Sequence, residues 1–267
     1  MLTMAGRTAA LAFALGPLAG ATAQAGPDAV ARAVAEWPRR DTGRVQLRVD
    51  PVLPDTVQSA SWLAAVARAS EDVGPRLEVT ADVLPPILLV ASRERMEAVA
   101  GVAANGLTDF RTPALLLVYS EPPNQLAIRH ELGHWLVAAA WAGPWPPAWI
   151  HEGMATWAQG ECSGAGIRAV AAALADADAL PALSRLVVDF RELPEVPAYL
   201  AAGSLVGYLA SVRPGLLRVL WRHGLEGVAA AIGRDVTQLE REWRQWLTAV
   251  PESDRPAVAT FSSGCRP

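Results

Sequence analysis

The stretch from Asn124 to Gln159 decides the fold, and it reads NQLAIRHELGHWLVAAAWAGPWPPAWIHEGMATWAQ. It contains Glu131 and three of the four histidines of the chain, which are His130, His134 and His151. On a helix, the two histidines four residues apart lie on one face with their rings about 6 Å apart. This spacing is typical of two ligands of one metal ion, with Glu131 placed to accept a proton from water. The alternative is a core helix with two hydrogen-bonded histidines.

A catalytic zinc site takes three protein ligands, so a third one is required downstream. The longer pattern HExxHxxGxxH is excluded, because Val137 and Ala140 stand where its glycine and third histidine would be. After His134 no Asp, Glu, His or Cys follows until His151 and Glu152. These two neighbours point about 100° apart on a helix, so we expect only one of them to face the metal. The residues alone leave that choice open.

The motifs HELGH (130–134) and PAWIHEGMATW (147–157), joined by a proline-rich loop, resemble those of the gluzincin metallopeptidases. That clan includes thermolysin and the alanyl aminopeptidases, and the likeness is strongest to bacterial peptidase MA-like domains. It implies an α+β, zincin-like fold with an N-terminal mixed sheet, an HExxH active-site helix and a helical C-terminal lobe. It also implies Zn²⁺ held by His130, His134 and Glu152, with His151 not a ligand. Thr156 departs from the pattern, since thermolysin-like enzymes have there an Asp that orients a histidine ligand.

The same resemblance implies the catalytic groups. Glu131 is the expected general base, and the segment YLAAGSLVGYL (199–209) resembles a helix whose first tyrosine donates to the oxyanion. Tyr199 is therefore the expected catalytic donor, with Tyr208 and His223 as alternatives. Tyr208 also suits core packing, and His223, before a glycine, also suits the end of a helix. In gluzincins the edge strand of the sheet lies along the cleft, and strand 114–119 is in the right place in the sequence.

The function expected from these features is that of an exported zinc-dependent peptidase acting on a peptide or protein substrate. An endopeptidase is favoured, because no GxMEN-like exopeptidase motif precedes HELGH. One alternative is a non-catalytic binding or assembly factor on a zincin fold, although it would not need Glu131. Another is a zinc amidase acting on a cell-wall amide. The formal net charge of −4 and the lack of basic clusters argue against a nucleic-acid partner.

The first 25 residues resemble an export signal, which predicts a periplasmic or secreted protein. Arg7 precedes an apolar run over 8–21, and ATAQA (21–25) offers a cleavage site. No later apolar run of membrane-spanning length escapes interruption by proline or charge, so no stable span is expected after cleavage. We expect a sheet-containing lobe with the metal-binding helices over 26–160, a helical lobe over 161–250 and a flexible tail over 251–267. Oligomeric state is not predicted.

Cys162 and Cys265 are the two cysteines of the chain. In an exported protein they can form a disulfide, which would tie the C-terminal end to the region after the Glu152 helix. The alternative is a pair of free thiols.

Hydrophobic periodicity and turn residues predict the remaining elements. We expect Asn105-Gly106 to form a turn, Gly74-Pro75 to end a helix, and Thr237 with Glu240 to form a capping box. The predicted strands are 44–49, 87–90 and 114–119, and the predicted helices are 27–37, 55–73, 93–100, 167–175, 183–188, 199–211, 216–223, 225–232 and 237–247.

Overall fold

The computed structural model describes residues 28–42, 45–80, 84–141, 143–262 and 264–265. The predicted export signal over 1–25 lies outside them. The first half alternates helices and strands: α1 (Asp28–Glu36), β1 (Arg39–Thr42), β2 (Val45–Val49), α2 (Ser59–Leu77), β3 (Ile87–Val90), α3 (Arg93–Ala100), β4 (Gly106–Asp109), β5 (Ala114–Val118), α4 (Gln125–Ala140) and α5 (Ala148–Gln159).

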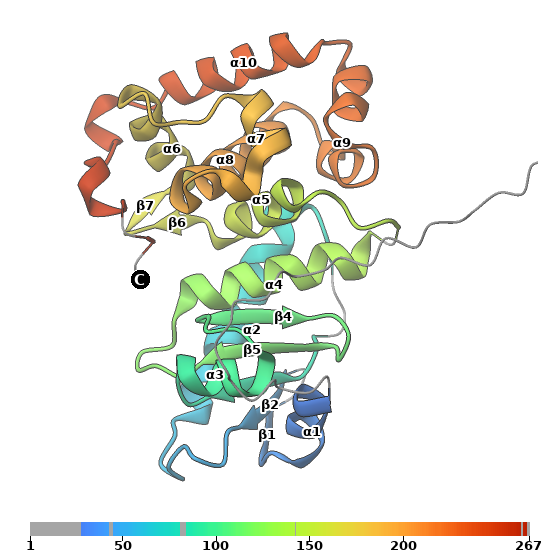
Figure 1. Cartoon of the computed structure of the whole chain (residues 1–267), viewed down its shortest axis with the longest axis vertical. Coiled ribbons are helices and arrows are strands. Elements are labelled where there is room, and N and C mark those ends of the chain that lie inside the picture. Colours follow the sequence, from blue (N-terminus) through green and yellow to red (C-terminus); the bar gives the residue numbers. More distant parts are fainter. Residues whose placement is uncertain (1–27, 43–44, 81–83, 142, 263, 266–267) are drawn as a thin grey trace, which may run out of the picture.

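The second half is mainly helical. It comprises β6 (Glu161–Cys162), β7 (Ala165–Gly166), α6 (Ile167–Asp176), α7 (Leu183–Asp189), the 3-10 turn η1 (Phe190–Glu192), α8 (Glu195–Val212), α9 (Leu216–Ile232), α10 (Val236–Thr248), and the 3-10 turns η2 (Glu252–Asp254) and η3 (Val258–Thr260). The predicted α+β class, with a mixed sheet first and helices later, is confirmed. Figure 1 shows α4 and α5 between the sheet and the upper helices.

The main sheet has the order β1-β2-β3-β5-β4, with three parallel central strands and an antiparallel strand at each edge. Successive residues of a strand point to opposite faces, and both faces here are covered. Leu89 and Leu117 belong to the core that includes α2 and α4, whereas Leu88 and Leu116 pack with residues of α1 and α3. Burial on both faces explains why β3 and β5 are continuous apolar runs without alternation.

The edge strand beside α4 differs from the expected one. β5 is an interior strand, paired on both sides, and β4 forms the edge. The expected turn at Asn105-Gly106 is wrong, because Gly106 begins β4 and pairs with Leu117. The reversal falls instead between β4 and β5, where Asp109 Oδ1 accepts a hydrogen bond from the backbone N–H of Arg111 at 2.8 Å. The sequence thus predicted the reversal at Asn105-Gly106, whereas this Asx-type turn begins four residues later, at Asp109.

Helix α2 also extends beyond its predicted end. It passes through Gly74 and Pro75 and ends at Leu77, followed by Glu78 in the left-handed conformation. A proline in the last turn removes one backbone donor, but Val73 and Leu77 are fully buried on either side of it. This packing offsets the local penalty and carries the helix one turn further.

Helices α4, α5 and α8 form a closely packed stack. A Cβ on Gly133 of α4 would lie 2.7 Å from the Ala158 Cβ of α5, and one on Gly203 of α8 would lie 2.6 Å from Thr156 Cγ2. Real Cβ atoms do not approach neighbours this closely, so glycine is required at both positions. The stack fixes α5 between the HExxH helix and the helical lobe.

Of two helix boundaries predicted in the helical lobe, one is confirmed and one is wrong. The predicted break near residue 224 is present, because Gly224 has φ 64° and kinks α9. The predicted capping box at Thr237 and Glu240 is wrong: Asp235 caps α10 and pairs with Gln238. Glu240 Oε1 instead accepts from the backbone N–H of Leu183 at 3.0 Å.

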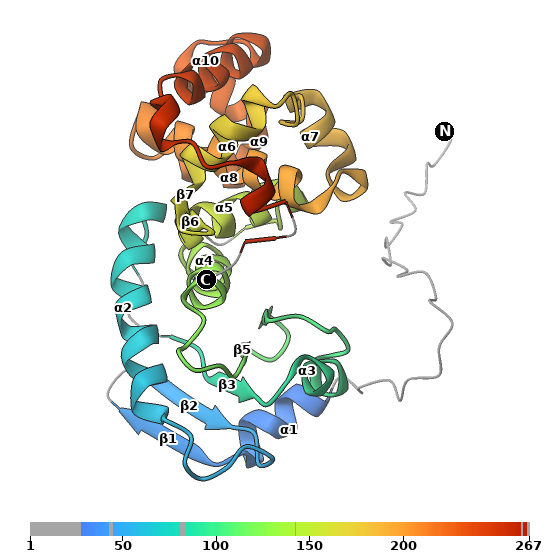
Figure 2. The same cartoon turned by 90° about the vertical axis from the view of Figure 1, so that its left-hand side faces the viewer.

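The C-terminal segment, described over residues 251–262 and 264–265, lies within the tail expected to be flexible over 251–267. It contains η2 and η3, and the Phe261 side chain is fully buried in the main core. The predicted disulfide between Cys162 and Cys265 is confirmed. Burial of an aromatic side chain and this cross-link together hold the described part of the segment against the helical lobe (Figure 2).

Within the described residues, no single helix is long and apolar enough to cross a membrane. By length and composition alone, α8 and α9 together would pass this test, as a pair bent by 120°.

Candidate metal centre

Two helices with well-defined starts position the predicted ligands. Helix α4 begins after Asn124, whose Oδ1 accepts hydrogen bonds from the backbone N–H groups of Leu126 and Ala127, each at 3.1 Å. This cap fixes the register that places His130 and His134 one turn apart on the side facing α5. Helix α5 begins directly after Pro147, and Glu152 lies in its second turn.

His130, His134 and Glu152 form a group that could hold a metal ion. The Glu152 Oε2 atom lies 3.5 Å from His130 Nε2 and 3.4 Å from His134 Nε2. Around a tetrahedral ion with bonds of about 2.05 Å, neighbouring ligand atoms are about 3.3 Å apart. A charge-assisted hydrogen bond would be shorter, about 2.7–2.9 Å. The two separations from Glu152 therefore fit ligands of a shared ion better than a charge-assisted hydrogen bond, and all three ligand atoms lie within 4.8 Å of one another.

The electrostatics of the group follow from burial and mutual proximity. Burial alone would raise the pKa of Glu152, but the two imidazoles beside it hold the pKa of this carboxyl well below its usual range. Burial would lower the pKa of His130, and the facing Glu152 together with Glu131 outweighs this and raises it. A carboxylate that is ionised at neutral pH and faces two imidazole nitrogens is a suitable donor set for a divalent cation.

His151 does not join this group. Its ring stacks on His134 with centroids 4.0 Å apart, and Phe110, Trp145 and Trp221 lie around it at 4.7–6.1 Å. Burial, reinforced by nearby His134, lowers the pKa of His151 to about 3, so the ring is neutral. Of the two neighbours left open by spacing, the structure brings Glu152 to the histidines and places His151 among aromatic rings.

Glu131 lines the same cavity and is held by the edge strand. Its carboxylate is largely buried, and Thr108 Oγ1 of β4 lies 2.8 Å from Oε2 and 3.0 Å from the Glu131 backbone oxygen. A Cβ on Gly106 would come within 2.8 Å of Glu131 Cγ and Oε1, so glycine leaves room for this side chain. Sequence reasoning missed both residues, because it placed a turn where β4 begins. The short G-L-T-D segment before a strong strand was the available signal.

Among the three predicted oxyanion donors, the structure brings one to the cavity. Tyr199, at the start of the second turn of α8, lines the cavity with its ring centroid 6.4 Å from that of His130. Burial, together with the Glu152 carboxylate, raises the pKa of Tyr199, so its hydroxyl keeps its proton. Tyr208 points elsewhere and donates to Glu242 at 2.9 Å. His223 lines a different surface hollow, beside α7 and α10.

The cavity around the metal group has a volume of about 580 Å³, which is within the range of small-ligand and peptide subsites. Besides the predicted residues, Arg191 and Gln159 line it. Arg191 Nη2 lies 3.9 Å from Glu152 Oε1, with a mostly exposed side chain. Gln159 stands two helical turns after Glu152, a spacing that could have identified it from the sequence. Nothing in the sequence around Arg191 marks it as part of this site.

Several buried polar atoms beside the ligands have no hydrogen-bond partner within the described part of the chain. Among them are His134 Nδ1, His151 Nε2 and Thr156 Oγ1. A buried polar atom without a partner is costly, and water is the usual partner in such places. Thr156, four residues after Glu152, therefore makes no hydrogen bond to His134 Nδ1.

Comparison of the chain with protein-family models and with curated proteins finds no match in either set. The chemistry of the site is therefore inferred from its own residues.

Proposed function

We propose that this chain is an exported zinc-dependent endopeptidase with a zincin-like fold of the gluzincin type. The observation that carries the proposal is the grouping of the His130, His134 and Glu152 ligand atoms, with Glu152 Oε2 3.4–3.5 Å from both imidazole Nε2 atoms and Glu131 buried beside them. Two histidines and one carboxylate are a common catalytic zinc set, which leaves a fourth position for water or substrate.

Glu131 and Tyr199 have separate roles in the proposed hydrolysis of an amide. When bound, zinc supplies a Lewis acid that polarises the scissile carbonyl and lowers the pKa of water. Glu131 accepts a proton from the attacking water and passes it to the leaving nitrogen, so that the amide gives a carboxylate and an amine. Tyr199, whose hydroxyl stays protonated, donates a hydrogen bond to the oxyanion.

The edge strand supports an extended peptide as the substrate. Strand β4 lies at the border of the sheet and lines the cavity through Gly106, Leu107 and Thr108. An extended chain can add to such an edge through backbone hydrogen bonds. An endopeptidase uses this mode of binding, because it recognises backbone on both sides of the scissile bond.

Digestion of an unbiased peptide library, with and without a chelator, tests the proposal. We expect cleavage at internal bonds that stops when zinc is removed and returns when zinc is added. Release of single terminal residues would replace the endopeptidase with an exopeptidase. Stoichiometric zinc without cleavage of any peptide would contradict the proposal and favour a binding factor or an amidase.

A further inference from the structure

The C-terminal segment reaches the cavity of the candidate metal centre. Gly264 and Cys265 line this cavity together with Glu152 and Tyr199, although they lie far from both in the sequence. Figures 1 and 2 both show the end of the described chain beside β6 and β7 and near α4. A stretch of chain close to the C-terminus thus forms part of the wall around the site.

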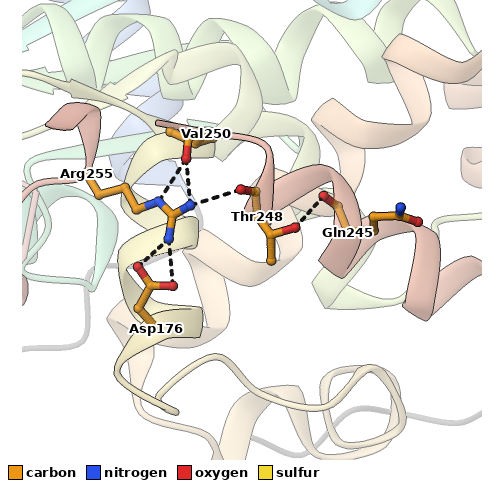
Figure 3. A network of polar contacts seen from close by, with 5 residues as sticks. All are labelled: Asp176, Gln245, Thr248, Val250 and Arg255. Atoms are coloured by element: carbon orange, nitrogen blue, oxygen red, sulfur yellow. Dashed lines mark hydrogen bonds and ion pairs between the residues drawn. The ribbon is translucent and has the colours of Figure 1, made fainter. Parts of the chain in front are cut away.

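The base of this segment is clamped by Arg255 (Figure 3). Its Nη1 donates to Asp176 Oδ1 at 2.7 Å, which ties the segment to the end of α6. Its Nε donates to the Val250 backbone oxygen, and its Nη2 to that of Thr248, each at 3.0 Å. One guanidinium therefore joins α6, the end of α10 and the start of the segment, and it is largely buried while doing so.

Further along, Phe261 and Cys265 hold the segment. The Phe261 side chain is fully buried in the main core, and η3 packs against α6. The backbone N–H of Gly264 donates to the Phe261 oxygen at 3.0 Å, a bond within the segment itself. Cys265 is bonded to the buried Cys162 of β6, which follows α5 almost directly. The disulfide is thus the covalent link between the cavity wall and the strand that follows the Glu152 helix.

We propose that Gly264 and Cys265 form a size-limiting wall of the substrate cavity and that the Cys162–Cys265 disulfide holds this wall in place. This inference rests on the proposed function. Breaking the bond frees Gly264 and Cys265, while the Arg255 clamp and the Phe261 anchor keep the described part of the segment before them folded. The cavity then admits bulkier groups, and the metal ligands on α4 and α5 are unaffected. The wall is therefore a specificity determinant whose position depends on the redox state of one bond.

The test compares access of two chelators to bound zinc, before and after reduction. The probes are 1,10-phenanthroline and the bulkier bathophenanthroline disulfonate, which share the same pair of metal-binding nitrogens. A water-soluble phosphine is the reductant, because thiols would themselves bind zinc. It breaks the sulfur–sulfur bond by a two-electron step that leaves two thiols and a phosphine oxide, with water supplying the oxygen and the protons. The partly exposed Cys265 offers the sulfur for attack.

We expect reduction to accelerate zinc removal by the bulky chelator relative to the compact one by roughly 5- to 30-fold, the factor that small changes in an opening equilibrium produce. The oxidised protein and a Cys162→Ala/Cys265→Ala variant are the controls. The variant should behave like the reduced protein and should not respond to phosphine. Unchanged rates for both chelators would overturn the proposal. An equal acceleration of both would also overturn it, since this would show a loosened metal site instead of an opened wall.

Folding and the proposed function are checked separately. The bond closes a sequence separation of 103 residues, so its loss lowers stability, and circular dichroism must show that each form is folded at the assay temperature. If the double variant does not fold, the chelator comparison uses only the folded wild-type protein, before and after reduction. Hydrogen exchange of residues 258–265, which requires neither metal nor turnover, should rise after reduction; unchanged protection would contradict the proposal. If reduction changes the ratio of the two zinc-removal rates but no form of the protein cleaves peptides, the wall proposal is supported and the peptidase proposal fails.

Discussion

The Thr108 hydroxyl oxygen lies 2.8 Å from the Glu131 carboxylate, which joins the edge strand of the sheet to the HExxH helix at the candidate catalytic base. Thr108 itself is almost fully buried. Its hydroxyl also lies 3.0 Å from the Glu131 backbone oxygen, so it contacts the helix at two points. This pairing makes Thr108 a positioning residue for Glu131, and it links β4 to the chemistry of the site.

Replacing Thr108 by valine should test this positioning role. Valine keeps the branched shape but removes the hydroxyl, which leaves the buried carboxylate without this partner. We expect kcat to fall by roughly 10- to 100-fold with little change in KM or zinc content, because a small misplacement of a catalytic group costs about this much. Thr108→Ser retains the hydroxyl and should restore most of kcat. Equal losses in both variants, or a loss confined to KM, would contradict the role.

The identity of the third ligand can be tested with neighbouring substitutions. Glu152→Ala and His130→Ala should each weaken zinc binding by more than about 100-fold, since loss of an outer partner of a ligand already costs 10- to 100-fold. His151→Phe is the matched control, because it keeps an aromatic ring against Phe110, Trp145 and Trp221. Elemental analysis should find about one zinc per chain in this control. Loss of zinc from the His151 variant alone would reverse the assignment.

The donor to the oxyanion is tested by comparing two tyrosines of α8. Tyr199→Phe should lower kcat by roughly 100- to 1000-fold at unchanged zinc content, as expected when one oxyanion donor is removed. Tyr208→Phe is the control: its hydroxyl donates to Glu242, and burial raises its pKa to about 12, with Glu242 contributing. Activity should survive in this control. Comparable kcat values for Tyr199→Phe and the wild type would assign the oxyanion donor to another group.

The close helix stack leads to a prediction about stability. A Cβ on Gly203 would lie 2.6 Å from Thr156 Cγ2 and 2.8 Å from Thr156 Cβ, so Gly203→Ala forces α8 and α5 apart. We expect a loss of about 1–3 kcal/mol in the free energy of unfolding, together with weaker zinc binding, because α5 carries Glu152. Gly166→Ala is the control, since its Cβ would meet no atom within 4 Å. Chemical denaturation should show little change in the free energy of unfolding of Gly166→Ala. A similar loss in Gly166→Ala and Gly203→Ala would contradict the role of close packing at Gly203.

Much of this fold could be predicted because it rests on local signals. The apolar runs of β3 and β5, the periodic helices of the second half and the Gly224 break all depend on neighbouring residues. The candidate ligands could be found for the same reason, since two histidines four apart on a helix must share a face. The choice of Glu152 over His151 required the resemblance to known sites.

The features that could not be predicted depend on contacts distant in sequence. Strand β4 exists through its pairing with β5, so a four-residue segment beginning at Gly106 looked like a turn. Pro75 remains inside α2 because its neighbours are buried. Arg191 and Gly264 reach the cavity only through the folding of the helical lobe and the C-terminal segment. Thr108 could not be linked to Glu131 without the geometry of the edge strand.

The rate of peptide hydrolysis by Glu131→Gln tests the central claim most directly. Glu131 contacts Thr108 and lines the cavity but is not one of the three grouped ligands, so glutamine should leave zinc content and melting temperature nearly unchanged. The amide cannot accept the proton of the attacking water, and we predict that kcat on a peptide cleaved by the wild type falls by about 10²- to 10⁴-fold. Hydrolysis by the zinc-loaded Glu131→Gln protein at the wild-type rate would contradict the account.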